Sequence, residues 1–207
     1  MTATATRFLY LTRHGDALAD GSGLTESGLR QAALLGRRLA DVPLSAVHHG
    51  PLPRAAQTAA TIGQHLDGVP LHACEIAGDY LPHVPERAEL PADSADHLLR
   101  FLAPWPEHER LRGPALAAGA LERFTGPVEG TEERHELVVT HNFLIGWLVS
   151  RLMVAPKWRW LALNHCNAAL TVIRYTPGRP DTVLLYNDMR HLPADLRWTG
   201  FPAELHM

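Results

Sequence analysis

The architecture of this chain is decided near its start by the run Phe8-Leu9-Tyr10-Leu11-Thr12-Arg13-His14-Gly15. Its first five residues are apolar or β-prone, and the run stops at a glycine, which predicts a short buried strand opening onto a loop. An arginine and a histidine therefore stand at the carboxyl end of this strand.

The same order of strand, polar residue and helix returns further along the chain. A strand at residues 44–47 leads into a helix that starts near Pro53, which suits a first helical turn and places Arg54 close to the helix start. Another strand at residues 136–140 ends at His141, and a helix follows. Ligands of parallel α/β sheets bind outside the carboxyl ends of the strands, so we expect His14, Arg54 and His141 to meet in one pocket.

Strands alternate with helices over most of the chain. Thr25 is a candidate N-cap for a helix with apolar residues at helical spacing, and further strands are expected at residues 69–73, 168–175 and 182–186. This alternation predicts an α/β fold, a three-layer αβα sandwich with a mostly parallel central sheet. The apolar residues assigned to the buried face of the first helix are Leu29, Ala32, Ala33, Leu35 and Leu39.

One segment departs from this alternation. Prolines recur between residues 74 and 114, where only residues 96–102 have a helical pattern, and a further helix is expected at 115–124. We therefore predict a single domain over residues 1–207, with a lid-like insertion at about 74–114 over the carboxyl ends of the strands.

Composition narrows the class of protein. The 207 residues are 46% hydrophobic and 20% charged, which fits one globular domain. A net charge of −3 argues against a nucleic-acid binder. Two cysteines do not make a disulfide framework, and no apolar run reaches the length of a signal-peptide core or a membrane span. We expect a cytoplasmic protein with no membrane partner.

The residues at the strand ends suit the chemistry of phosphate esters. Arg13 and Arg54 offer planar donor forks for a phosphate group. A neutral His14 can attack phosphorus in line, form a covalent phosphoenzyme and release phosphate to water. His141, with the N–H groups at the helix start near Asn142, would stabilise charge on the phosphate oxygens. A carboxylic acid must protonate the leaving oxygen.

Four segments, in order, are similar to the motifs of one family. The family is the histidine phosphatase superfamily (phosphoglycerate mutase-like, branch 1), whose Arg-His-Gly motif matches Arg13-His14-Gly15. The matching segments are Leu11-Thr12-Arg13-His14-Gly15 with Leu24-Thr25-Glu26-Ser27-Gly28, Pro51-Leu52-Pro53-Arg54-Ala55, Val138-Val139-Thr140-His141 and Leu185-Tyr186-Asn187-Asp188.

The resemblance implies a phosphomonoester hydrolase that acts through a phosphohistidine, without a metal ion or other cofactor. In it His14 is the nucleophile, and Arg13 and Arg54 bind phosphate. His141 is the second pocket histidine, with Asn142 beside it. The general acid of the family is commonly a glutamate after the third strand, which implies Glu75, with Asp79 as the alternative.

The resemblance leaves the substrate open between a small phosphorylated metabolite and a phosphoprotein. Residues 136–174 are similar to the branch that dephosphorylates phosphoserine and phosphothreonine proteins, and a homodimer is also open. Two further readings remain: a phosphoglycerate mutase-type phosphotransferase, and a non-catalytic module that binds phosphate or protein. The insertion carries eight carboxylates against four arginines, which favours a phosphatase over a mutase. Tyr80, Phe101 and Trp105 point to an apolar or aromatic leaving group.

Departures from the family pattern motivate the binding-module reading. Relatives often have serines where this chain has His49-Gly50, an asparagine where it has Asp20, and a glycine where it has Asn142. Asp20 would repel a phosphate unless it turns away. Thirteen histidines also raise the question of a metal, but their spacing is not that of a zinc site.

Overall fold

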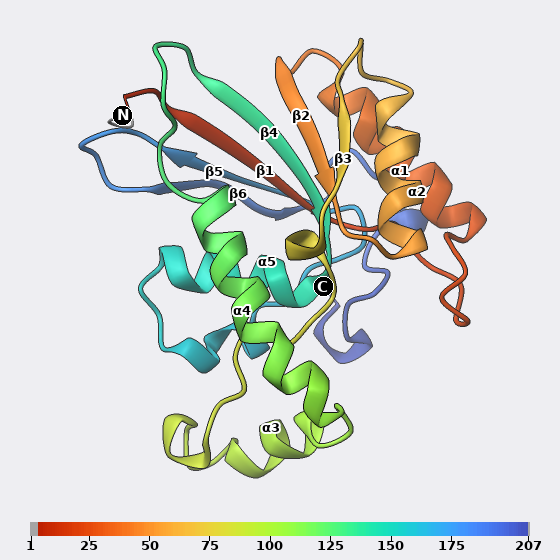
Figure 1. Ribbon diagram of the computed structural model, residues 1–207. Helices are drawn as coiled ribbons and strands as arrows, with labels where there is room; N and C mark the ends of the chain where they lie inside the picture. The colour runs from red at the N-terminus through yellow and green to blue at the C-terminus, as the bar shows by residue number, and fades with distance from the viewer. Residues whose placement is uncertain (1–3, 207) are drawn as a thin grey trace.

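A six-stranded sheet forms the centre of the molecule in a computed structural model that describes residues 4–206 (Figure 1). The strands lie in the order β3-β2-β4-β1-β5-β6. The first four are parallel to one another, whereas β5 runs antiparallel to both β1 and β6. The bounds are β1 Arg7–Arg13, β2 Leu44–His49, β3 Leu71–Ala73, β4 Arg134–Thr140, β5 Leu170–Tyr175 and β6 Thr182–Asp188.

Helices cover both faces of this sheet, which confirms the predicted three-layer α/β sandwich (Figure 1). Helices α1 (Glu26–Leu39) and α2 (Pro53–Gly63) pack on one face, and α4 (Glu107–Phe124) and α5 (Asn142–Leu152) on the other. As predicted, Thr25 caps α1, where its hydroxyl accepts a hydrogen bond from the Gly28 N–H, and Pro53 lies in the first turn of α2. Helix α3 (Ala95–Leu102) lies apart from the sheet.

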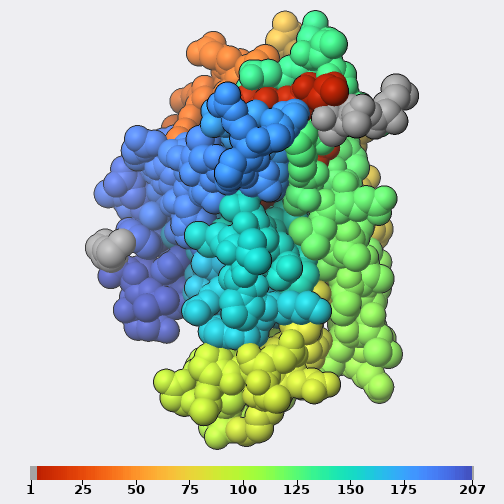
Figure 2. Space-filling view, turned by 90° about the vertical axis from the view of Figure 1, so that its left-hand side faces the viewer, coloured from red at the N-terminus to blue at the C-terminus, as the bar shows by residue number. Residues whose placement is uncertain are grey.

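Short 3₁₀ turns complete the chain. Their bounds are η1 Glu75–Ala77, η2 Arg87–Glu89, η3 Lys157–Ala162, η4 Ala194–Leu196 and η5 Ala203–Leu205. The segment that contains η2 and α3 forms a lobe at the foot of the molecule, drawn in yellow-green in Figure 2.

The register between β1 and β4 decides where the polar residues meet. Arg13 pairs with Thr140 at the ends of the two parallel strands, and the His14 N–H donates a 3.0 Å hydrogen bond to the Thr140 carbonyl. His14 and His141 therefore leave the sheet side by side, although they are far apart in the sequence.

Two details differ from the sequence prediction. Leu29 is 44% exposed, because the buried stripe of α1 runs through Ala32, Leu35 and Leu39 and leaves Leu29 at its margin. Helix α4 begins at Glu107 and continues through Pro114, where we expected the helix to start only afterwards. Proline removes one backbone hydrogen bond from a helix, but packing of the flanking residues, Gly113 among them, holds the helix together here.

Among residues 4–206, none of the helices combines the length and the apolar character that crossing a bilayer requires.

A buried ionic cluster joins β1, β4 and α4. The carboxylate of Glu136 lies 3.2 Å from Arg7 and 3.1 Å from Arg123, and His48 is 3.5 Å away. Burial alone would raise the pKa of Glu136, but the His48 hydrogen bond and the two arginine charges outweigh it and lower the pKa to about 2. The cluster holds Glu136 ionised inside the fold.

Removing this carboxylate should destabilise the protein strongly. Glu136→Ala leaves Arg7 buried without its partner, so we expect the free energy of unfolding to fall by about 3 kcal/mol in urea titrations. Asp96→Ala breaks the exposed pair with Arg87 and should cost less than about 1 kcal/mol. Equal losses in the two variants would contradict this account of the cluster.

Candidate active site

A cavity of about 620 Å³ opens at the carboxyl ends of β1 and β4. Its polar wall contains Arg13, the last residue of β1, and His14, His141 and Asn142, which follow the two strands. Asp79 comes from the segment after β3. The structure thus brings together residues that the sequence placed at separate strand ends.

His14 is buried and held in one tautomer. Its Nδ1 lies 2.8 Å from the Gly15 carbonyl oxygen, which can only accept, so Nδ1 carries the proton and Nε2 keeps its lone pair. Burial, then the nearby His141 and Arg13, lower the pKa of His14 to about 3. The imidazole is therefore neutral near pH 7, as a nucleophile must be.

Gly15 permits the close packing of the loop that carries His14. A Cβ atom at Gly15 would lie 2.5 Å from the Gly28 carbonyl oxygen, so a larger residue would push α1 away. The Gly15 N–H donates to the Thr58 hydroxyl at 3.0 Å, and that hydroxyl donates to the Arg54 carbonyl at 2.7 Å. These contacts tie the nucleophile loop to α2.

The two arginines approach His14 from different sides. On α2, Arg54 donates from Nε to His14 Nε2 at 3.2 Å and from Nη2 to Asp79 at 2.7 Å. Arg13 donates from Nη1 to the carbonyls of His165 at 2.8 Å and Gly200 at 2.5 Å. Burial lowers the pKa of Arg13, and its buried Nε has no hydrogen-bond partner among the described residues.

His141 is the least satisfied polar group of the site. Its ring is buried 5.0 Å from the His14 ring, centroid to centroid, and neither ring nitrogen has a hydrogen-bond partner within residues 4–206. Burial, then Arg54 and Arg13, lower the pKa of His141 to about 3. Buried ring nitrogens normally have partners, so this arrangement suits a ligand that supplies oxygen atoms.

Of the two candidate acids, the structure brings Asp79 to His14. The Glu75 side chain is 60% exposed, pairs with Arg112 at 2.6 Å and does not line the cavity. Asp79 is 27% exposed, lines the cavity and contacts Arg54, and its Oδ2 lies 3.5 Å from His141 Nδ1. Glu75 is the first residue of the 3₁₀ turn η1 and Asp79 follows the end of this turn, so the two carboxylates contact different partners.

Asn142 reaches the cavity wall but is engaged there by a loop. Its Oδ1 accepts a 2.6 Å hydrogen bond from the His165 N–H, and its Nδ2 lies 3.4 Å from Asn164 Oδ1. The side chain expected to contact phosphate therefore also fixes the loop after η3.

Of the three departures from the family pattern, Asn142 lines the cavity, whereas Asp20 and His49-Gly50 do not. Asp20 is exposed and accepts hydrogen bonds from the Ser22 N–H and hydroxyl, at 2.9 and 2.7 Å. Its charge is turned away from His14. His49 faces its own neighbour, with Nδ1 2.9 Å from the Gly50 carbonyl.

Sequence reasoning missed two parts of the site. The buried Asn167 donates from Nδ2 to the His14 carbonyl at 2.9 Å and so supports the nucleophile loop. The C-terminal segment supplies Gly200, Phe201 and Pro202 to the cavity wall. Neither part carries a local sequence signal, because both act through contacts distant in the chain.

Comparison with known proteins establishes the family. The model of the histidine phosphatase superfamily (branch 1) matches residues 9–188. The chain belongs to this superfamily, which confirms the resemblance.

Curated relatives and solved structures agree with this assignment. The chain is similar to the mitochondrial serine/threonine-protein phosphatase Pgam5 of Caenorhabditis briggsae, with 30% identity over 92% of this chain and 66% of the relative. It is also similar to PGAM5 of Homo sapiens, with 28% identity over 93% and 66%. The chain thus spans about 66% of the length of these relatives. YhfR of Bacillus stearothermophilus shares the fold, with a TM-score of 0.64, 23% identity and 89% and 98% of the two chains covered.

The names of the curated relatives overturn one expectation. We expected a cytoplasmic protein, whereas these relatives are named as mitochondrial, which points away from a plain cytoplasmic location. The sequence argument failed because the lack of a long apolar run and the presence of only two cysteines do not distinguish the cytoplasm from other compartments of the cell.

Neutral buried histidines should make stability depend on pH. His14 and His141 have pKa values near 3 in the folded chain against 6.5 in an unfolded one, so only the unfolded state gains these protons as the pH falls below 6.5. The free energy of unfolding should therefore fall towards acid pH, by up to about 1.4 kcal/mol per pH unit for each histidine.

Urea titrations at several pH values test this slope. His141→Asn should flatten it, and His108→Asn, a change at an exposed histidine, should keep the wild-type slope. A stability that does not change between the unfolded and folded pKa values would show that these histidines are not buried in neutral form.

Proposed function

We propose that this chain hydrolyses phosphomonoesters through a phosphohistidine at His14, without a metal ion. The observation that carries the proposal is the meeting of a neutral His14, Arg13 and His141 in one cavity, with Arg54 hydrogen-bonded to His14. The ring nitrogens of His141 have no hydrogen-bond partner among residues 4–206. Among the described residues, no three His, Cys, Asp or Glu side chains are grouped as metal ligands. Metal independence remains a prediction.

In the first step, His14 Nε2 attacks phosphorus while the bond from phosphorus to the leaving alcohol oxygen breaks. Arg54 already donates to Nε2, and its fork can pass to the phosphate oxygens as substrate enters. The proton stays on Nδ1 and is donated to the Gly15 carbonyl, and this hydrogen bond stabilises the positive charge of the phosphorylated ring.

The remaining groups of the site act on the phosphate oxygens and on the leaving oxygen. His141 and the free N–H groups at the start of α5 face the phosphate oxygens. Asp79 gives a proton to the leaving oxygen, and its carboxylate then takes a proton from the water that attacks phosphohistidine. Contacts to Arg54 and His141 hold Asp79 where this exchange can occur.

The cavity favours a phosphatase over the mutase alternative. A mutase must hold a carboxylate and a second phosphate, which requires further cations. The cavity walls within residues 4–206 offer no lysine and no arginine beyond Arg13, with Arg54 beside it. The non-catalytic alternative does not account for a neutral His14 whose tautomer leaves Nε2 as the nucleophile. The substrate is a phosphorylated metabolite or phosphoprotein, and the relatives named serine/threonine-protein phosphatases support the latter.

Loss of the nucleophile should abolish turnover. With a chelator present, we expect p-nitrophenyl phosphate hydrolysis by the wild type, and a fall in kcat of at least about 10⁴-fold in His14→Ala. His108→Ala, at an exposed histidine, should retain the activity. Activity that persists in His14→Ala, or that the chelator removes, would refute this mechanism.

Substitutions of Asp79 and Glu75 should have different effects on kcat. Asp79→Asn removes the proton donor and should lower kcat by about 10²–10⁴-fold, most strongly for alkyl phosphates, whose leaving oxygen needs the proton most. Glu75→Gln changes an exposed carboxylate outside the cavity and should leave kcat unchanged. The reverse pattern would restore Glu75 as the general acid.

A further inference from the structure

Besides its phosphate-binding residues, the cavity has a lining that is apolar and aromatic. It is built from four segments: helix α3, the turn before α4, the region of α5 and η3, and the C-terminal segment. The residues are Leu98, Phe101, Trp105, Phe143, Leu161 and Phe201.

Phe143 joins Phe101 and Trp105 of this wall to the aromatic core. Its ring lies 4.9 Å from the fully buried Trp160, 5.7 Å from Trp105 and 6.1 Å from Phe101, centroid to centroid. The contacts to Trp160 and Phe101 are edge to face, an arrangement that aromatic rings favour. The wall is therefore anchored in the core and extends outward to Phe101.

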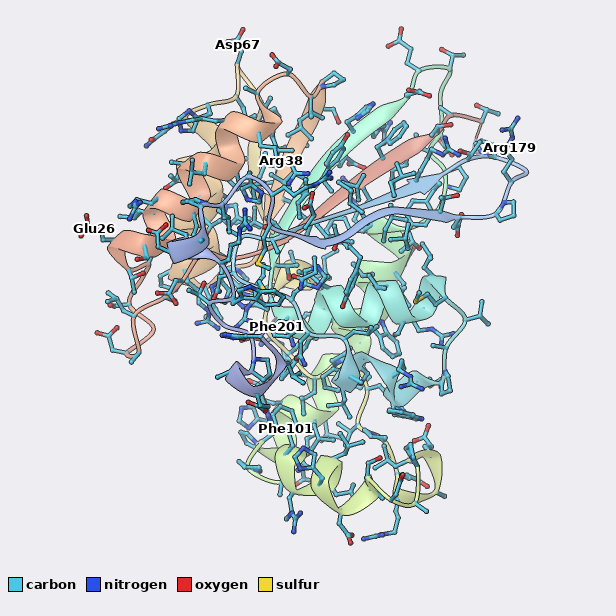
Figure 3. All side chains as sticks on the ribbon, turned by 180° about the vertical axis from the view of Figure 1, so that it is seen from behind. Glu26, Arg38, Asp67, Phe101, Arg179 and Phe201 are labelled. Carbon is cyan, nitrogen blue, oxygen red and sulfur yellow. The ribbon has the colours of Figure 1, made fainter. Side chains whose placement is uncertain are left out.

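Phe101 is only partly covered by packing within the protein. Its side chain remains 47% exposed although it stands on the cavity wall. Figure 3 labels Phe101 on α3 and, above it in that view, Phe201 on the C-terminal segment; both residues line the cavity. Two aromatic side chains thus flank the cavity where a leaving group would extend from phosphorus.

The charges on the cavity wall exclude a strongly anionic leaving group. Beyond Arg13 and the two histidines of the phosphate pocket, the lining offers His97, Asn142 and Asn164 as polar groups, together with the carboxylate of Asp79. A second phosphate or a carboxylate would meet Asp79 and apolar rings without a matching cation. An uncharged aromatic group would instead cover exposed apolar surface.

We infer that the site selects phosphomonoesters whose alcohol carries an uncharged aromatic group, and that Phe101 and Phe201 are the residues that select it. The inference rests on the proposed function, since it names the substrate class of the same cavity. The aromatic group lies against Phe101, Phe201 and the ring of Phe143, while phosphate occupies the pocket of His14.

Two substrates of equal chemical reactivity test this selection. In 3-phenylpropyl phosphate and propyl phosphate the leaving alcohols differ in the distant phenyl group, so a difference in kcat/KM reports binding of that group. We expect the wild type to favour the phenylpropyl ester roughly tenfold, because burying a phenyl ring contributes about that factor. 3-Phosphoglycerate should be the poorest substrate.

Variants assign the preference to its residues. Phe101→Ala and Phe201→Ala should each bring the ratio of the two kcat/KM values towards one. Leu29→Ala, at a similarly exposed apolar residue on α1, should keep the wild-type ratio. Circular dichroism checks that each variant is folded.

The outcomes separate the selection from the reaction itself. Release of phosphate from both esters at equal kcat/KM would overturn the selection and leave hydrolysis standing. A preference that survives in both phenylalanine variants would overturn the assignment to these residues. Release from no ester would contradict the proposed function, and the inference with it.

Discussion

The site depends on the parallel pairing of β1 with β4. Because Arg13 pairs with Thr140, both strands end at the same level, and the His14 N–H is held by the Thr140 carbonyl. The residue that follows each strand is a histidine, so the centroids of the His14 and His141 rings lie 5.0 Å apart, without a direct bond between the rings. A shift of one residue in this register would turn one of the rings away from the cavity.

Burial then gives these histidines their chemical character. Solvent exclusion keeps His14 and His141 neutral, while Arg13 and Arg54 remain charged close by. The result is a cationic pocket with uncharged imidazoles, in which the ring nitrogens of His141 have no hydrogen-bond partner among the described residues. The oxygen atoms of a phosphate group can accept or complete the hydrogen bonds that the fold itself does not form, and these bonds then contribute to the affinity for phosphate. The apolar wall from Leu98 to Phe201 extends the same cavity towards the leaving group.

Local patterns were enough to predict the parts of the site attached to strand ends and helix starts. Arg13, His14, Arg54 and His141 occupy such positions, as do the N-cap Thr25 and the first-turn residue Pro53. The structure confirms the sandwich that they imply. The choice between Glu75 and Asp79 depends on how one 3₁₀ turn directs two side chains, which periodicity does not encode. Asn167 and Gly200 reach the site from distant segments, and Leu29 lies one position outside the buried stripe of its helix.

The most direct test of the account is to trap the covalent intermediate. The wild-type protein would be mixed with radiolabelled phosphomonoester, quenched in alkali within a turnover, digested and sequenced by mass spectrometry. The account predicts one labelled peptide, with phosphate on His14, stable in alkali and lost in acid. Label on another residue, or no protein-bound phosphate while the ester is hydrolysed, would contradict a phosphohistidine at His14.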